Sequence, residues 1–260
     1  MESGLDFYTA KALLDWHVDL GADEAIGDLP INRYEVPKEA PKMPKMPKAK
    51  PAEAAPVAQF KGPEPVEVAR QMARDAQDLE GLRAAMAAFT HCQLKNGARN
   101  LVFADGTAGA RVMVIGDAPT REEDQQGKPL VGPAGQMLDA MFGAINLGRD
   151  IADAPIYVTS VLPWRASQTR DPSPDDVTMM LPFLERHIAL ANPDVLVLMG
   201  NQACEALLGV KGITKLRGTW GEALGKPALP MLHPAYLLRT PQAKREAWAD
   251  LLSLQAKLRG

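Results

Sequence analysis

The sequence predicts an α/β fold: a three-layer domain in which helices flank a central, mostly parallel four-stranded sheet. Two observations support this prediction. From Arg111 onward, short apolar runs alternate with helical patterns, as they do in strand–helix–strand units. Three of the runs are continuously apolar, which is typical of strands that are buried on both faces.

The expected strands are the four apolar runs Val112–Ile115, Ile156–Leu162, Val195–Met199 and the weaker Leu229–Leu232. The expected helices cover Glu67–Phe89, Ala134–Ile145, Pro174–Ala191, Gln202–Leu208 and Lys244–Leu258. The helix that begins at Pro174 has the clearest start signal. Ser173 offers a capping hydroxyl, proline occupies the first turn, and two carboxylates follow at the positive end of the helix.

The chain divides into a helical segment at residues 1–30, a linker rich in Lys, Pro and Ala at residues 31–65, and the α/β domain at residues 66–260. Eight of the 22 prolines lie between Pro37 and Pro65, together with six lysines. Proline at this density excludes helix and sheet, so we expect an extended linker of polyproline II character. The short helix expected at Thr9–Leu20 should dock on the main domain or on a partner, and the pattern does not distinguish the two.

Composition excludes several classes of protein. The net charge is −3, no apolar stretch reaches the length of a membrane span, and the first residues lack a basic, apolar signal region. We therefore expect a cytoplasmic monomer without membrane contact, which would meet phosphate only through a local basic face. Two cysteines, Cys92 and Cys204, are too few for a four-thiolate zinc site or iron–sulfur cluster.

Unusual residues follow the expected strands at their carboxyl ends, where ligands bind in such folds. The four strands lead into Gly116-Asp117-Ala118-Pro119, Ser160, Gly200-Asn201 and His233-Pro234. The glycines after the first strand could bind an anion through backbone N–H groups or simply shape a tight loop. An imidazole at a strand end, held by a rigid turn, can donate a hydrogen bond to a developing anion, although a structural histidine is the alternative.

Two longer motifs carry a resemblance. GDAPTREEDQQGKPLVGPAG is similar to a motif usually written GEAPG..ED..G.PFVG.AG, and HPAYLLR is similar to HPS.LLR. In this order and spacing, the segments from about Phe89 to Leu258 resemble the uracil-DNA glycosylase superfamily, most closely its family 4, the bacterial and archaeal iron–sulfur type. The resemblance implies hydrolysis of the bond between a base and its deoxyribose, after the base is flipped out of the stack.

The resemblance also assigns roles. It implies that His233 donates to O2 of the departing base, and that Asp117, one methylene shorter than the usual Glu, orients water or stabilises the cationic sugar. The implied base-binding residues are Gly116, Ala118, Pro119, Leu130 and Ser160. The implied DNA-binding residues are Arg165, Arg170, Gly200, Asn201, Pro234, Tyr236, Leu237 and Arg239, with Tyr236 and Leu237 as the wedge. We also expect Arg217 to belong to the basic face.

The chain departs from the family pattern at the base pocket. Leu130 replaces the phenylalanine that stacks on the flipped base, and Ser160 replaces the asparagine that reads the uracil edge. Each lost contact is worth about 1–3 kcal/mol. We therefore expect weaker and less discriminating recognition of uracil.

The cluster positions differ as well, because the four family cysteines correspond to Phe89, Cys92, Trp164 and Met180. One thiolate cannot hold a cluster, so we expect hydrophobic packing in its place and no iron–sulfur cofactor.

Three functions remain open. The first is a DNA glycosylase that acts on DNA containing uracil or another deaminated base. The second is a non-catalytic module that binds DNA or damaged sites and recruits a repair protein through its N-terminal helix or linker. The third is a phosphate- or nucleotide-binding α/β protein unrelated to repair. The presence of both Asp117 and His233 favours the first, since a pure binder has no evident need for the pair.

Overall fold

The computed structural model describes residues 64–166 and 172–259. The expected N-terminal helix, residues 31–63 of the linker and Arg170 lie outside these residues, so the division at residues 30 and 65 stays a prediction. Within the described ranges, no helix is both long and apolar enough to cross a membrane.

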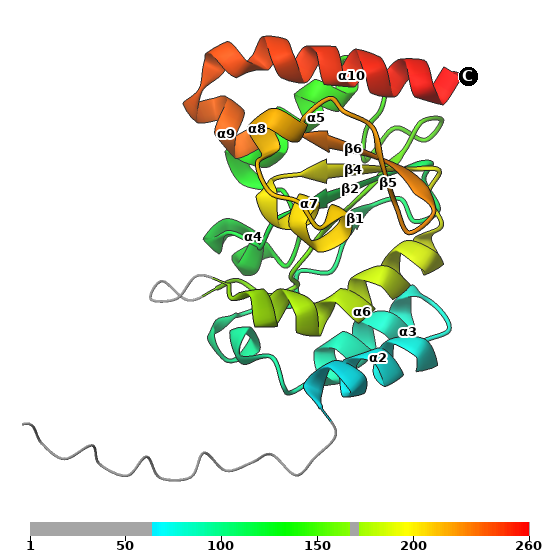
Figure 1. Ribbon diagram of the computed structural model, residues 1–260, viewed down its shortest axis with the longest axis vertical. Helices are drawn as coiled ribbons and strands as arrows, with labels where there is room; N and C mark the ends of the chain where they lie inside the picture. The colour runs from blue at the N-terminus through cyan, green and yellow to red at the C-terminus, as the bar shows by residue number, and fades with distance from the viewer. Residues whose placement is uncertain (1–63, 167–171, 260) are drawn as a thin grey trace, which may run out of the picture. The chain divides into compact units, whose positions relative to one another are not determined.

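A six-stranded sheet with the order β1-β3-β2-β4-β6-β5 forms the centre of the domain (Figure 1). Its four inner strands are parallel, as predicted: β2 (Val112–Gly116), β3 (Ile156–Ser160), β4 (Val195–Met199) and β6 (Lys226–Met231). The prediction of four strands is wrong in number, because two short antiparallel strands form the edges of the sheet. These are β1 (Asp105–Gly106), which pairs with β3, and β5 (Gly221–Ala223), which pairs with β6. With two and three residues, these edge strands are too short to show an apolar pattern.

Side chains along each inner strand alternate between two apolar layers, which confirms the three-layer architecture. Met113 and Ile115 point to one layer, whereas Val112 and Val114 point to the other. The first layer contains α2 (Pro65–Asp75), α3 (Leu79–Ala88), α6 (Pro174–Ala191) and α7 (Asn201–Leu208). The second contains α5 (Gly132–Gly143), α9 (Pro234–Arg239) and α10 (Lys244–Arg259). Figure 1 shows α6 with α2 and α3 on one side of the sheet and α10 on the other.

The remaining elements are short: η1 (Gln93–Gly97), α4 (Arg121–Gln126), α8 (Ile213–Leu216) and η2 (Pro241–Ala243). The prediction of α6 is confirmed at both ends. Ser173 caps it by accepting a hydrogen bond from the Asp176 N–H at 3.2 Å, and the Asp176 carboxylate accepts one from the Ser173 N–H at 2.9 Å. Together these bonds form a capping box.

The single helix expected at Glu67–Phe89 is wrong, because the segment forms α2 and α3 with a break between them. Ala76 takes an extended conformation, and Asp78 starts the second helix by accepting a hydrogen bond from the Gly81 N–H at 2.7 Å. Neither proline nor glycine marks this break, so composition alone did not reveal it.

Strand register brings the predicted site segments to one edge of the sheet. Gly116 lies opposite both Ser160 and Met199, and Met199 lies opposite Met231. The carboxyl ends of the four parallel strands are therefore level, and the segments that follow them begin side by side.

Candidate functional site

Three predicted site residues meet at the end of β2. A Cβ atom built on Gly116 would lie 3.8 Å from Cδ1 of Leu130 and 3.9 Å from Nε2 of His233. Ser160 is the β3 residue paired with Gly116, and it is buried. The Leu130 side chain and the His233 imidazole thus face the same strand end, where the sequence placed the base pocket.

His233 is held as a neutral hydrogen-bond donor. It caps α9, and its Nδ1 accepts a hydrogen bond from the Ala235 N–H at 3.2 Å. An accepting Nδ1 carries no proton, so the proton of the neutral ring is on Nε2, the atom nearest Gly116. Burial, reinforced by the positive charge of Arg239, lowers the pKa of His233 to about 4. At neutral pH the ring therefore presents an uncharged Nε2–H.

Asp117 is bound to the first turn of α7. Its Oδ1 accepts hydrogen bonds from the N–H groups of Gln202 at 2.9 Å and Ala203 at 3.1 Å. Burial raises the pKa of the Asp117 carboxyl, although these hydrogen bonds favour the anion. Asn201 is also engaged, since its Oδ1 accepts from the Gly212 N–H at 3.1 Å. The N–H groups of Gln202 and Ala203 thus fix the carboxylate of Asp117, and the contact of Gly200 and Asn201 with DNA stays a prediction.

Gly200 allows this arrangement. It adopts φ +114°, which favours glycine, and a Cβ there would lie 2.2 Å from Oδ2 of Asp117. The N–H of Ala118 donates to Oε1 of Gln202 at 2.9 Å, so this amide too is used within the protein. Pro119 is buried behind it. The turn after β2 is therefore tied to the start of α7 from both sides.

Leu130 has an unusual backbone that the sequence did not reveal. Its φ is +48°, a conformation that costs a non-glycine residue about 1–3 kcal/mol. The buried Glu123 holds it there by accepting a hydrogen bond from the Leu130 N–H, and Glu123 also accepts from the N–H of Thr120, the residue that caps α4. The Thr120-to-Glu123 spacing is a capping-box signal that could have identified both α4 and this contact.

Two of the arginines expected to contact phosphate are paired inside the protein. Nε of Arg165 lies 3.5 Å from the buried carboxylate of Asp124, and Arg217 makes a two-pronged ion pair with the buried Asp250. Arg217 thus fastens the segment before β5 to α10 rather than joining a free basic face. Arg239 on α9 is exposed and remains suited to phosphate.

The predicted wedge needs a correction at α9. Pro234 and Leu237 are buried, with Leu237 only 1% exposed, so its side chain cannot enter a DNA duplex without leaving the core. The neighbouring Leu238 is 41% exposed, and Tyr236 is half-buried. Leu238 is therefore the apolar side chain of this turn that is free to insert.

The four positions that the family resemblance matches to cluster cysteines form part of one apolar core. Phe89, Cys92, Trp164 and Met180 are each at most 3% exposed and belong to the same layer. An iron–sulfur cluster needs four thiolates, and this set supplies one. Within residues 64–166 and 172–259, no three His, Cys, Asp or Glu side chains are grouped to hold a metal. The residues present do not fit the cluster.

Much of this chain is similar in sequence to known proteins. Residues 103–252 match the profile of the family described as the Uracil DNA glycosylase superfamily. A type-4 uracil-DNA glycosylase of Thermotoga maritima is 34% identical over 153 residues, which are 58% of this chain and 78% of the relative. One from Archaeoglobus fulgidus is 31% identical over 170 residues, 61% of this chain and 82% of the relative. One from Sulfurisphaera tokodaii is 30% identical over 177 residues, which are 64% of this chain and 79% of the relative. The family match spans all six strands, Asp117 and His233.

Proposed function

This chain belongs to the uracil DNA glycosylase superfamily, and we propose that it removes uracil or another deaminated base from DNA through a modified base pocket. It is a DNA repair glycosylase, a hydrolase of N-glycosidic bonds. The observation that carries the proposal is the neutral His233, whose Nε2–H faces the end of β2 beside Leu130.

Charge development explains the role of His233. When the bond between the base and C1′ of the deoxyribose breaks and water adds to C1′, negative charge gathers on the departing base. A hydrogen-bond donor aimed at O2 of the base stabilises this charge, and therefore stabilises the transition state more than the ground state. Because the pKa of His233 is about 4, the ring is already neutral at pH 7 and donates its Nε2–H as a hydrogen bond. One such donor contributes about 10²–10³ in rate.

Asp117 stabilises the positive charge that develops on the sugar. Its carboxylate is fixed between the end of β2 and the first turn of α7, so it cannot swing away when DNA binds. A fixed anion stabilises the positive charge that develops on the sugar and orients the attacking water. The hydrogen bonds from the Gln202 and Ala203 N–H groups hold the carboxylate in place for this role.

The pocket should bind uracil loosely. Leu130 offers no π-face for stacking, and the Ser160 hydroxyl is too short to bond both edge groups of the base. Rejection of other bases depends on polar groups that the wrong ligand leaves unpaired, and this pocket has fewer of them. We expect low activity on uracil, with weak discrimination against hypoxanthine or xanthine.

The protein is proposed to fold without an iron–sulfur cluster. Support comes from the buried side chains of Phe89, Trp164 and Met180, which occupy a shared apolar layer where the family has cysteines. Iron and acid-labile sulfide in the purified protein test this proposal. Stoichiometric iron would overturn it.

DNA is the proposed substrate, with Leu238 as the wedge that fills the gap left by the flipped base. The proposal includes a cytoplasmic monomer whose residues 1–60 contact a repair protein or assist DNA binding. Deletion of these residues should leave base excision intact while weakening affinity for DNA or partner. Loss of folding after the deletion would place them in the core instead.

The function is tested by incubating the protein with oligonucleotides that carry uracil, hypoxanthine or xanthine, single- and double-stranded, followed by alkaline strand scission. His233→Ala is the paired variant and should lose about 10²–10³ of the excision rate. Tight DNA binding without excision of any base would favour the second candidate, a damage-binding module.

A further inference from the structure

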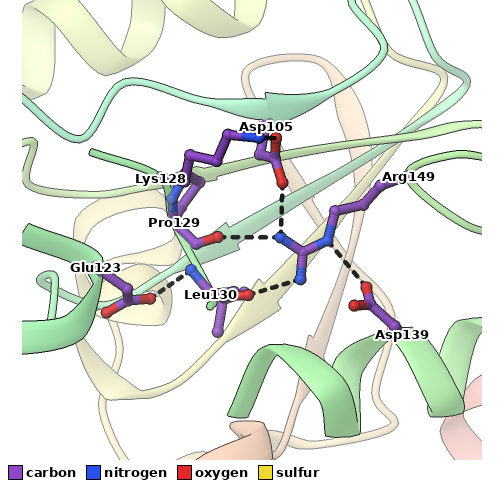
Figure 2. A network of polar contacts seen from close by, with 7 residues as sticks. All are labelled: Asp105, Glu123, Lys128, Pro129, Leu130, Asp139 and Arg149. Atoms are coloured by element: carbon purple, nitrogen blue, oxygen red, sulfur yellow. Dashed lines mark hydrogen bonds and ion pairs between the residues drawn. The ribbon is translucent and has the colours of Figure 1, made fainter. Parts of the chain in front are cut away.

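Arg149 lies on the connection between α5 and β3, and its side chain is only 9% exposed. Its guanidinium donates hydrogen bonds to four residues (Figure 2). Nε donates to Asp139 at 2.9 Å, Nη1 donates to Asp105 at 2.9 Å and to the Pro129 carbonyl at 3.1 Å, and Nη2 donates to the Leu130 carbonyl at 2.6 Å. The arginine thus joins two carboxylates to the backbone of the loop before α5.

The carboxylates fix the guanidinium in place. Lys128 Nζ lies 3.1 Å from the second oxygen of Asp105, so this carboxylate is shared between two cations. Burial acts to raise the pKa of Asp105, but the hydrogen bonds from Lys128 and Arg149 outweigh it and lower the pKa below its ordinary value. Asp105 is therefore an anion at neutral pH, and it orients the plane of Arg149.

Leu130 is held on both sides by side chains remote from it in sequence. Figure 2 shows Glu123 at its N–H and Arg149 at its carbonyl. The carbonyl also lies against α5 so closely that a Cβ on Gly135 would be 2.1 Å from its oxygen. These contacts maintain the left-handed φ of Leu130 and direct its side chain toward Gly116.

We propose that Arg149 is a positioning residue for base excision: by holding the Leu130 carbonyl, it places the Leu130 side chain against the flipped base beside His233. The identity of the ligand rests on the function proposed above. Two of the four hydrogen bonds from the planar guanidinium of Arg149 reach the loop, at the Pro129 and Leu130 carbonyls, while the other two hold it to carboxylates. Lysine, a point charge on a flexible stem, cannot reproduce that geometry. Misplacing a group that orients a substrate by about 1 Å is enough to lower a rate about 10²-fold.

The experiment compares Arg149→Ala with Arg186→Ala. Arg186 is a matched control because it also donates two hydrogen bonds to a backbone carbonyl, that of Ala76, at 3.0 and 2.7 Å, but between α6 and α2. For each variant we would measure single-turnover excision at limiting and saturating protein, the unfolding midpoint, and the NMR shift of the Leu130 methyl groups.

Arg149→Ala should slow excision about 10²-fold at saturation, shift the Leu130 methyl signals and regain rate when millimolar guanidinium is added. Arg149→Lys should stay slow. Arg186→Ala should change the unfolding midpoint but neither the excision rate nor the Leu130 signals. If Arg149→Ala fails to fold, Gly135→Ala tests the same contact, because its methyl group would lie 2.1 Å from the Leu130 carbonyl oxygen and 3.2 Å from Nη2 of Arg149 and so push the two apart.

A folded Arg149→Ala with wild-type excision and unmoved Leu130 signals would overturn the proposal. If the wild type excises no base, the proposed function fails. The Leu130 signals then decide the positioning role alone: a shift supports it and an unchanged spectrum overturns it.

Discussion

Replacing Asp117 by Asn separates its charge from its hydrogen bonds. The amide oxygen of Asn can accept the same two N–H groups, from Gln202 and Ala203, that Oδ1 of Asp117 accepts. The substitution removes only the negative charge, which in Asp117 lies at the N-terminus of α7 and beside the pocket. A charge at a helix N-terminus is worth about 0.3–1 kcal/mol, so Asp117→Asn should unfold close to the wild-type midpoint.

Asp117→Ala should behave differently, because it leaves two N–H groups without their acceptor. Leaving buried polar groups unsatisfied costs about 1–3 kcal/mol. For a domain of this size, that lowers the unfolding midpoint by about 2–12 °C, at roughly 2–4 °C per kcal/mol.

Excision rates then reveal the role of the charge. If the anion stabilises the cationic sugar, both variants should lose about 10²–10³ in single-turnover rate, equivalent to about 2.7–4 kcal/mol. Burial raises the pKa of Asp117, so the carboxylate becomes protonated at a higher pH than an ordinary carboxylate does. As the pH is lowered, wild-type activity should therefore begin to fall at that higher pH. Asp117→Asn has no carboxyl to protonate and should not show this fall. Asp250→Asn on α10, which breaks the ion pair with Arg217, is the control for lost stability without lost rate. Wild-type excision by Asp117→Asn would refute the electrostatic role and leave Asp117 as a helix cap.

Three further predictions concern recognition, acid stability and phosphate contact. Leu130→Phe with Ser160→Asn should raise uracil excision and sharpen its preference over hypoxanthine; a folded, DNA-binding double variant no faster than wild type would show that the deficit lies elsewhere. Burial lowers the pKa of His187 to about 4. Between pH 6.5 and 4 the unfolded chain therefore binds more protons than the folded one, and the free energy of unfolding falls by up to about 3 kcal/mol as the pH decreases through that window. Urea unfolding across these pH values should show a shallower fall for His187→Phe, and an equal fall would exclude His187 as its source. Arg239→Gln should lower the salt slope of DNA binding by about one and raise the pKa of His233; an unchanged slope would remove Arg239 from the interface.

The sheet and the longer helices were predictable because their signals are local. Continuous apolar runs predicted β2, β3 and β4, a weaker run predicted the second half of β6, and the Ser173 start signal predicted the first residue of α6. The motifs likewise placed Gly116, Leu130 and His233 in one site, and the level strand ends brought them together.

Contacts made by residues far apart in sequence were not predictable. Arg149 binds Asp105 across 44 positions and Leu130 across 19, and neither separation leaves a periodic trace. The burial of Leu237 and the engagement of the α7 amides by Asp117 likewise depend on packing between elements, which a single sequence does not display.

The position of β6 in the sheet has a consequence for biosynthesis. β6 pairs with β4 and β5, and His233 follows it by two residues. Chains emerge from the ribosome N-terminal end first, so the strand ends that carry Gly116 and Ser160 are made well before the imidazole. A chain cut short before residue 233 carries the Gly116 and Ser160 segments without the hydrogen-bond donor of the site. Base excision at the full rate therefore requires synthesis to pass residue 233, and a copy without this imidazole should excise bases about 10²–10³-fold more slowly.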